Sequence, residues 1–147
     1  SVDLIDDVLD TNLRSVFILS NEFARPLIAE KKPGRIVNIA SIAATSYSGG
    51  GAALYSTTKA GVVRITETLA VEWSKFHINV NGIAPGLFAT DMADGMIDRA
   101  GDFSVNFPRK RVAQPEQMDS TLLYLVSPSS DAVTGTVIKI DDGQGGR

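Results

Sequence analysis

A tyrosine and a lysine four positions apart, Tyr55 and Lys59, are the residues of this sequence best suited to acid–base chemistry. On a helix, side chains with this spacing lie on one face about one turn apart. A phenol has a reference pKa of about 10, so it needs a nearby positive charge to favour its phenolate near neutral pH. Such a pair is more often a solvated helix face. Its interpretation therefore depends on the residues around it.

Other polar residues occur at the places where strands and turns are expected to end. Ser41 ends a short β-branched run, and a glycine-rich loop leads from it to Tyr55. The carboxyl ends of parallel strands form the edge of a sheet where ligands bind, so we expect Ser41 and Tyr55 to lie there together. Pro85-Gly86 ends a second apolar run and would expose backbone beside the same cleft. Asn12, uncommon in mid-helix because its amide competes with the backbone, is a possible fourth member.

The spacing of apolar residues predicts the elements that must position these side chains. Helices are expected at Leu4–Ile28, at Tyr55–Phe76 and from Pro115 onward, the last filled by Leu122, Leu123, Leu125 and Val126. Strands are expected at Arg35–Ser41, Ile78–Ala84 and Thr136–Ile140. Residues 87–114 form a long connection, typical of a functional lid or of a segment that carries short helices. This order predicts an α/β fold with a parallel sheet and right-handed crossovers.

Composition excludes several classes of protein. The 147 residues suit one domain, and 44% hydrophobic and 21% charged residues are near globular averages. A net charge of -3 gives no basic excess for nucleic acid. With no cysteine and one histidine, we expect no disulfide, thiolate nucleophile or metal site. No apolar run is long enough for a membrane span and no signal peptide is visible, which predicts a cytoplasmic protein with no membrane partner.

Six motifs in order resemble the short-chain dehydrogenase/reductase family across essentially the whole chain. They are Asp10-Thr11-Asn12-Leu13, Gly34–Ser41, Tyr55-Ser56-Thr57-Thr58-Lys59-Ala60-Gly61, Asn79–Gly86, Thr90, and Thr134-Gly135 with Asp141-Asp142-Gly143. The resemblance implies a Rossmann-like doubly wound parallel sheet. Residues 1–147 would be a single domain, the C-terminal catalytic half of that fold, with about three strands and flanking helices.

The resemblance also implies an activity, the interconversion of a carbonyl and a secondary alcohol by hydride transfer with NAD or NADP. Tyr55 would exchange a proton with the substrate oxygen, and Ser41 would hydrogen-bond the same oxygen. Lys59 would bind the nicotinamide ribose and favour the Tyr55 phenolate. Asn12 would anchor a water that links Lys59 to solvent.

The same resemblance assigns binding residues. Pro85 and Gly86 would form the turn beside the cofactor, while the Leu87 backbone and Thr90 would hold the nicotinamide carboxamide. The substrate-binding residues would be Ser41, Ala43, Tyr47 and Tyr55. Similarity to 3-oxoacyl-carrier-protein reductases and to sugar dehydrogenases is alike in strength, so both substrate classes stay open.

The family's glycine-rich pyrophosphate turn precedes the helix that begins this chain. We therefore expect a C-terminal half whose strand Arg35–Ser41 has an exposed edge, and which by itself does not bind NAD(H) or NADP(H) tightly. The alternative function is a catalytically silent association module. In the family, subunits pair through the helices corresponding to those of Asn12 and Tyr55, which implies a homodimer or homotetramer, and Ala60, Gly61 and Val63 would leave room for close helix approach.

Other conspicuous residues have structural interpretations. His77 is expected to end a helix in a left-handed conformation, which histidine tolerates. Trp73 and Phe76 are expected in the core or a subunit contact. Arg109-Lys110-Arg111 is expected to be a solvated lid segment, and Gly49-Gly50-Gly51 a flexible loop that lacks the context of a phosphate loop.

Overall fold

Three parallel strands form the sheet, in the order β1 (Gly34–Ile39), β2 (Ile78–Pro85) and β3 (Val137–Ile140). The computed structural model describes residues 1–47, 49–91, 93, 95, 98, 101–102 and 104–145. Gly34 is in register with Ile78 along the first pair, and Gly82 with Val137 along the second. Residues 78–84 of the central strand are all buried. The expected parallel α/β sheet with helices around it is confirmed.

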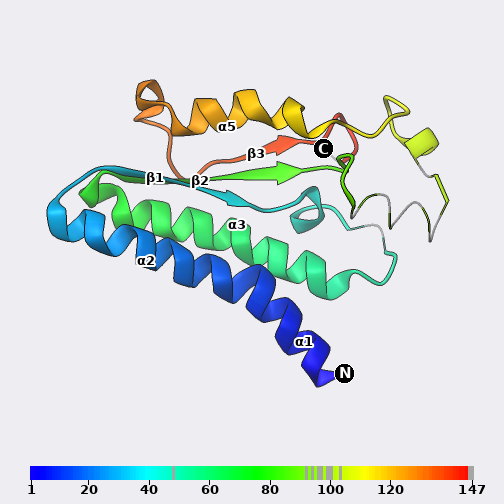
Figure 1. Ribbon diagram of the computed structural model, residues 1–147, viewed down its shortest axis with the longest axis horizontal. Coiled ribbons are helices and arrows are strands. Elements are labelled where there is room, and N and C mark those ends of the chain that lie inside the picture. Colours follow the sequence, from blue (N-terminus) through cyan, green and yellow to red (C-terminus); the bar gives the residue numbers. More distant parts are fainter. Residues whose placement is uncertain are drawn as a thin grey trace.

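Helices cover both faces of this sheet (Figure 1). One face carries α2 (Ser15–Glu30) and α3 (Ala53–Trp73), and the other carries α5 (Asp119–Val126). Before α2, α1 (Val2–Leu9) and a π-helical turn η1 (Asp10–Arg14) continue in one helical run. The short 3-10 turns are η2 (Ile42–Ala44), η3 (Ser74–Phe76), η4 (Ser104–Asn106), η5 (Pro115–Met118) and η6 (Pro128–Ser130). None of the described helices is long and apolar enough to cross a membrane.

Left-handed residues end the two long helices and direct the chain into the strands. Lys31 follows α2 with φ 55°, and the Lys32 N–H donates to the Leu27 carbonyl, a glycine-free form of the usual helix stop. His77 follows η3 with φ 57°, so its expected left-handed conformation is confirmed. His77 leads directly into β2, and Lys31 leads into β1 after two residues, because the chain must reverse at both places to run back across the sheet.

The main core lies between the sheet and the α2–α3 layer. Its buried members are Ala24, Leu69, Ala70, Trp73, Ile78 and Val80. Burial of each large side chain contributes about 1.5–3 kcal/mol. Trp73 is in this cluster, as expected. A second cluster lies beside the start of α3 and comprises Ala40, Val62 and Ala84, with Leu13 and Val16 packed against it.

The structure corrects the expected third helix. Pro115 opens the 3-10 turn η5, and α5 begins only at Asp119. Of the four apolar residues expected to fill the helix, Leu125 is buried, whereas Leu122, Leu123 and Val126 are exposed. Because α5 lies on the outside of the sheet and turns only one face toward it, its other apolar residues remain on the surface.

The outer edge of β1 is open. It pairs with β2 on one side and with no described strand on the other. A groove of ≈ 460 Å³ runs between this edge and the α2 layer, lined among others by Asn12, Phe23, Ile36 and Lys59. Ile39, the last residue of β1, is 49% exposed. The expectation of an apolar edge strand is therefore confirmed.

Candidate active site

The first turns of α3 connect directly to the carboxyl end of β1. Lys59 Nζ donates to the Ile39 carbonyl oxygen at 2.9 Å. The same ammonium lies 5.7 Å from the centroid of the Tyr55 ring, so the two side chains share one face of the helix as their spacing predicts. Partial burial lowers the pKa of Lys59 below its usual value. Tyr55 and Lys59 are thus held at the edge of the sheet.

Ser41 lies at the same edge, in the turn that follows β1. Its extended backbone (φ -168°) starts η2, and its hydroxyl oxygen accepts the Ala43 N–H at 3.1 Å. The Ser56 hydroxyl, from α3, donates to the Ala43 carbonyl at 2.5 Å. Since Ser56 follows Tyr55 directly, this bond ties the Ser41 turn to the tyrosine's own helical turn.

Asn12 reaches the site through a residue that sequence reasoning missed. It lies in the π-helical turn η1, and π turns occur often at functional sites. Its amide nitrogen donates to the Thr58 hydroxyl at 3.4 Å, and that hydroxyl donates to the Tyr55 carbonyl at 2.7 Å. Thr58 is fully buried. The sequence signal that could have identified Thr58 is a polar residue on the inward face of the predicted helix, directly before Lys59.

Gly61 allows this approach between η1 and α3. A Cβ built at Gly61 would lie 2.6 Å from Leu13 Cδ1. The space beside Gly61 is therefore filled by Leu13 of the same chain, so a close helix approach at this position occurs within one chain. The glycine instead lets η1 come close enough for Asn12 to bond Thr58.

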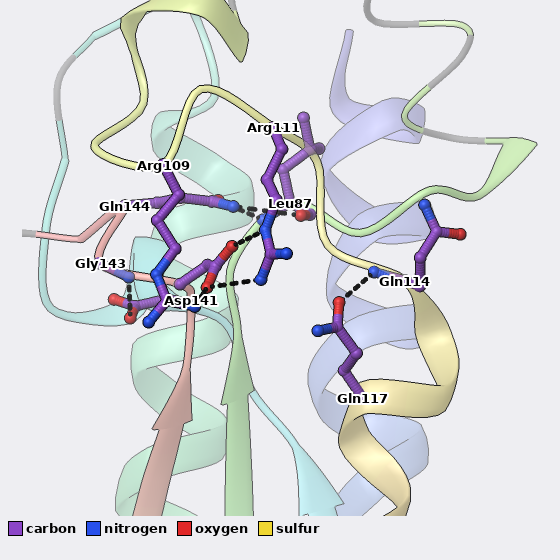
Figure 2. A network of polar contacts seen from close by, with 9 residues as sticks. Leu87, Arg109, Arg111, Gln114, Gln117, Asp141, Gly143 and Gln144 are labelled. Carbon is purple, nitrogen blue, oxygen red and sulfur yellow. Dashed lines mark hydrogen bonds and ion pairs between the residues drawn. The ribbon is translucent and has the colours of Figure 1, made fainter.

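The turn after β2 packs against the end of β3. The Gly86 N–H donates to the Ile140 carbonyl at 2.9 Å, and a Cβ at Gly86 would lie 2.9 Å from Asp141 Cα. The Leu87 N–H donates to Gln144 Oε1 at 2.6 Å, and Gln144 Nε2 donates to the Leu87 carbonyl at 3.2 Å (Figure 2). One primary amide is thus held by both backbone groups of Leu87. No sequence motif indicated Gln144.

Thr90 and Tyr47, which are also expected at the site, lie in the segments that follow β2 and η2. Thr90 is exposed, and its hydroxyl donates to the Phe88 carbonyl and accepts the Ala93 N–H, each at 3.4 Å. Tyr47 lies in the loop after η2 and is 49% exposed. Among the described residues, neither side chain bonds to Tyr55 or Ser41.

The basic segment of the lid is bound to the C-terminal turn. Arg109 reaches Asp142 at 2.9 Å, and Arg111 reaches the same carboxylate at 2.6 and 3.2 Å. The hydrogen bond from Arg111 lowers the pKa of Asp142 and raises the pKa of Arg111. For Asp142, burial of the carboxylate opposes this lowering, whereas the charge of Arg109 strengthens it. The segment is solvated as expected, since the Arg109 and Arg111 side chains are 65% and 46% exposed, and its two guanidinium groups in addition share one carboxylate partner.

A sequence profile described as Enoyl-(Acyl carrier protein) reductase matches residues 1–144. The chain belongs to the short-chain dehydrogenase/reductase family. It is 38% identical over 142 residues to a 2-dehydro-3-deoxy-D-gluconate 5-dehydrogenase of Dickeya dadantii, covering 94% of this chain and 55% of that protein. It is 33% identical to the 3-oxoacyl-(acyl-carrier-protein) reductase FabG of Vibrio cholerae, covering 93% of this chain and 56% of that protein.

Among solved short-chain dehydrogenase/reductase structures, that of a 4-hydroxyisoleucine dehydrogenase mutant with NADH and succinate superposes on this chain with a TM-score of 0.90. The sequences are 32% identical, and the match covers 98% of this chain and 60% of the other. The Rossmann-like sheet predicted from the resemblance is confirmed. The chain spans little more than half the length of the curated relatives it matches.

Proposed function

We propose that the protein carrying this chain is an NAD(P)-dependent oxidoreductase that interconverts a carbonyl and a secondary alcohol. The relatives named above are dehydrogenases and reductases, and one similar structure holds NADH. The observation that carries the proposal is the bond from Lys59 to the Ile39 carbonyl. It anchors the Tyr55–Lys59 pair at the edge of the sheet where the Ser41 turn also lies.

The backbone at Leu87 fits the nicotinamide end of such a cofactor. A carboxamide presents one acceptor and one donor, and Leu87 already holds a group of that chemistry, the side-chain amide of Gln144, through its N–H and its carbonyl. Pro85 and Gly86 would line the same turn, and Thr90 would lie beside it. Residues 1–147 contain no strand-turn-helix sequence with spaced glycines for the pyrophosphate.

The bound cofactor supplies or accepts the hydride. The Tyr55 hydroxyl would give a proton to the carbonyl oxygen in reduction and take it from the alcohol in oxidation, a role worth about 10²–10⁴-fold in rate. The Ser41 oxygen accepts the Ala43 N–H, which leaves its own proton to donate to the substrate oxygen.

The remaining residues would support Tyr55. The Lys59 ammonium has three N–H donors and uses one on Ile39, so the others can serve the ribose hydroxyls and the phenol. Asn12 would hold the Tyr55 turn through Thr58 and anchor the water that returns a proton to Lys59. Ala43 and Tyr47 would face the substrate, which is a 3-oxoacyl group or a sugar acid.

Substitution of Tyr55 by phenylalanine tests the proposal in the protein as expressed from its gene. Turnover of NADH and NADPH is followed with a panel of 3-oxoacyl thioesters and keto sugar acids. Tyr55→Phe is expected to lower kcat by about 10²–10⁴-fold. The matched control is Tyr124→Phe, because Tyr124 is half exposed on α5, across the sheet from α3, and should leave kcat within about twofold. Full activity of Tyr55→Phe would refute the assignment.

The same experiment separates the alternative function. A wild-type protein that turns over no substrate and binds neither cofactor, yet forms a dimer or tetramer, would be an association module. Exposed Leu122, Leu123 and Tyr124 on α5 and Phe17 and Ile18 on α2 offer apolar surface for a homo-oligomer in either case.

A further inference from the structure

The C-terminal turn after β3 presents a side-chain amide to the backbone of the turn after β2. Gln144 Oε1 accepts the Leu87 N–H at 2.6 Å, and Gln144 Nε2 donates to the Leu87 carbonyl at 3.2 Å. The two bonds form a closed ring between one side chain and one residue's backbone (Figure 2). A nicotinamide carboxamide carries the same two groups in the same arrangement.

The turn that carries Gln144 is built to hold it there. The carboxylate of Asp141, 3% exposed, accepts the N–H groups of Gly143 at 3.1 Å and of Gly145 at 3.0 Å. The Gln144 N–H donates to the Asp141 carbonyl at 2.8 Å. Asp142, next in the chain, is fixed by the guanidinium of Arg111. The position of the amide therefore follows from a rigid turn and not from a free surface side chain.

Gly86 leaves the room for this contact. A Cβ at Gly86 would lie 2.6 Å from Gln144 Oε1, closer than two such atoms can approach. The absence of a side chain at this position thus serves the approach of the Gln144 amide to Leu87 as well as the packing on Asp141.

The Leu87 backbone is held by other bonds besides those to Gln144. Its carbonyl also accepts the Ala113 N–H at 3.3 Å, and the neighbouring Ala89 N–H donates to the Ala113 carbonyl at 2.8 Å. The Gly86 N–H is bound to Ile140. Loss of the Gln144 side chain should therefore leave the Leu87 N–H without its acceptor while the other bonds keep the turn in place.

We propose that Gln144 is an internal placeholder that satisfies the Leu87 backbone until the nicotinamide carboxamide displaces it, and so sets the affinity for the cofactor. This inference rests on the proposed function. Leu87 has one N–H, and that N–H cannot serve both amides, so binding of the carboxamide requires the Gln144 side chain to leave. Gln144 is a positioning residue, because it acts on the cofactor through Leu87.

The test compares Gln144→Ala with Gln117→Ala in the protein as expressed from its gene. Gln117 is a matched control, since its side chain also accepts a backbone N–H, that of Gln114, at 2.7 Å, and the structure shows no contact of it with Leu87. Dissociation constants are measured for NADH and NADPH, and for ADP-ribose and its 2′-phosphate, which lack the nicotinamide.

Gln144→Ala is expected to bind its preferred reduced cofactor on the order of tenfold more tightly, because two hydrogen bonds no longer need to be broken. Binding of the ribose probes should be unchanged, and Gln117→Ala should match wild type throughout. Hydrogen exchange gives a second readout: the Leu87 amide should exchange faster in free Gln144→Ala than in free wild type and regain protection when cofactor is added.

Three results would overturn the placeholder, and they differ in what else they refute. Cofactor affinity that is equal in Gln144→Ala and wild type, or a shift of equal size with the ribose probes, refutes the placeholder alone. A wild-type protein that binds neither NADH nor NADPH refutes the proposed function and the placeholder with it.

Discussion

Thr66 of α3 offers a test of how α3 is joined to β1 beneath the site. It is fully buried, and its hydroxyl accepts the side-chain N–H of Asn38 at 3.0 Å while donating to the Val62 carbonyl at 2.8 Å. Asn38 is 7% exposed and immediately precedes Ile39, whose carbonyl holds Lys59. Thr66→Val keeps the shape of the side chain and removes the acceptor.

The expected loss can be worked from these contacts. A buried amide left without its partner costs about 1–3 kcal/mol. The added methyl group recovers about 0.8 kcal/mol by apolar burial, and helix propensity hardly changes between two β-branched residues. The free energy of unfolding should therefore fall by about 0.2–2.2 kcal/mol, with a middle value of about 1.2 kcal/mol. Thr68→Val is the matched control, because its hydroxyl bonds only backbone carbonyls of its own helix, and it should change stability by less than about 0.5 kcal/mol.

Urea unfolding followed by Trp73 fluorescence provides the assay, since Trp73 is the single tryptophan of the 147 residues and is buried in the core. The double variant Asn38→Leu/Thr66→Val removes both partners. It should lose at least about 1 kcal/mol less than the sum of the two single variants, because no orphaned amide remains. The reasoning is refuted if the stability loss of the double variant equals the sum of the two single losses, or if Thr66→Val and Thr68→Val lose equal stability.

Three other predictions concern packing and charge. Gly61→Ala should cost about 1 kcal/mol of unfolding free energy, because overpacking against Leu13 (about 1–3 kcal/mol) exceeds the helix-propensity gain of about 1 kcal/mol. In a Leu13→Ala background the same substitution should stabilise the protein. Equal effects in the wild-type and Leu13→Ala backgrounds would contradict the overpacking argument. Arg111 lowers the pKa of Asp142, so the carboxylate stabilises the fold above its ordinary pKa of 3.8 and loses that effect as pH falls through the lowered value. The urea midpoints of Asp142→Asn and wild type should therefore converge in acid. Burial lowers the pKa of Lys59, so wild-type stability relative to Lys59→Met should rise with pH from the lowered value up to 10.5; a flat difference would show that burial does not penalise the ammonium.

Local signals account for the parts of the fold that were predicted. Short runs rich in apolar and β-branched residues marked all three strands. For β2 the physical reason is burial, because residues 78–84 are all buried and a strand covered on both faces requires mostly apolar residues. His77 was placed at a helix end for its tolerance of positive φ, which the structure confirms. The filling of α5 was misjudged, because periodicity shows that a helix has an apolar side but not how much of that side another element covers.

Contacts between distant segments escaped the sequence reasoning. Gln144 and Leu87 are 57 positions apart, and Asn38 and Thr66 are 28 apart. Nothing in the type of a glutamine or a threonine says which backbone or amide it will meet. The π-helical turn at Asn12 was also missed, because one extra residue in a helical turn leaves the apolar spacing almost unchanged.

The sequence by itself determined the parallel α/β fold, the family, and the placing of Tyr55 and Lys59 on one helix face, since all of these depend on spacing within single elements and on the order of motifs. Only the tertiary structure decided that Lys59 bonds the end of β1, that Thr58 links Asn12 to the Tyr55 turn, and that Gln144 occupies the Leu87 backbone. The physical reason is that a hydrogen bond between separate elements requires its donor–acceptor distance to be set to within a few tenths of an ångström, which packing does and residue spacing does not.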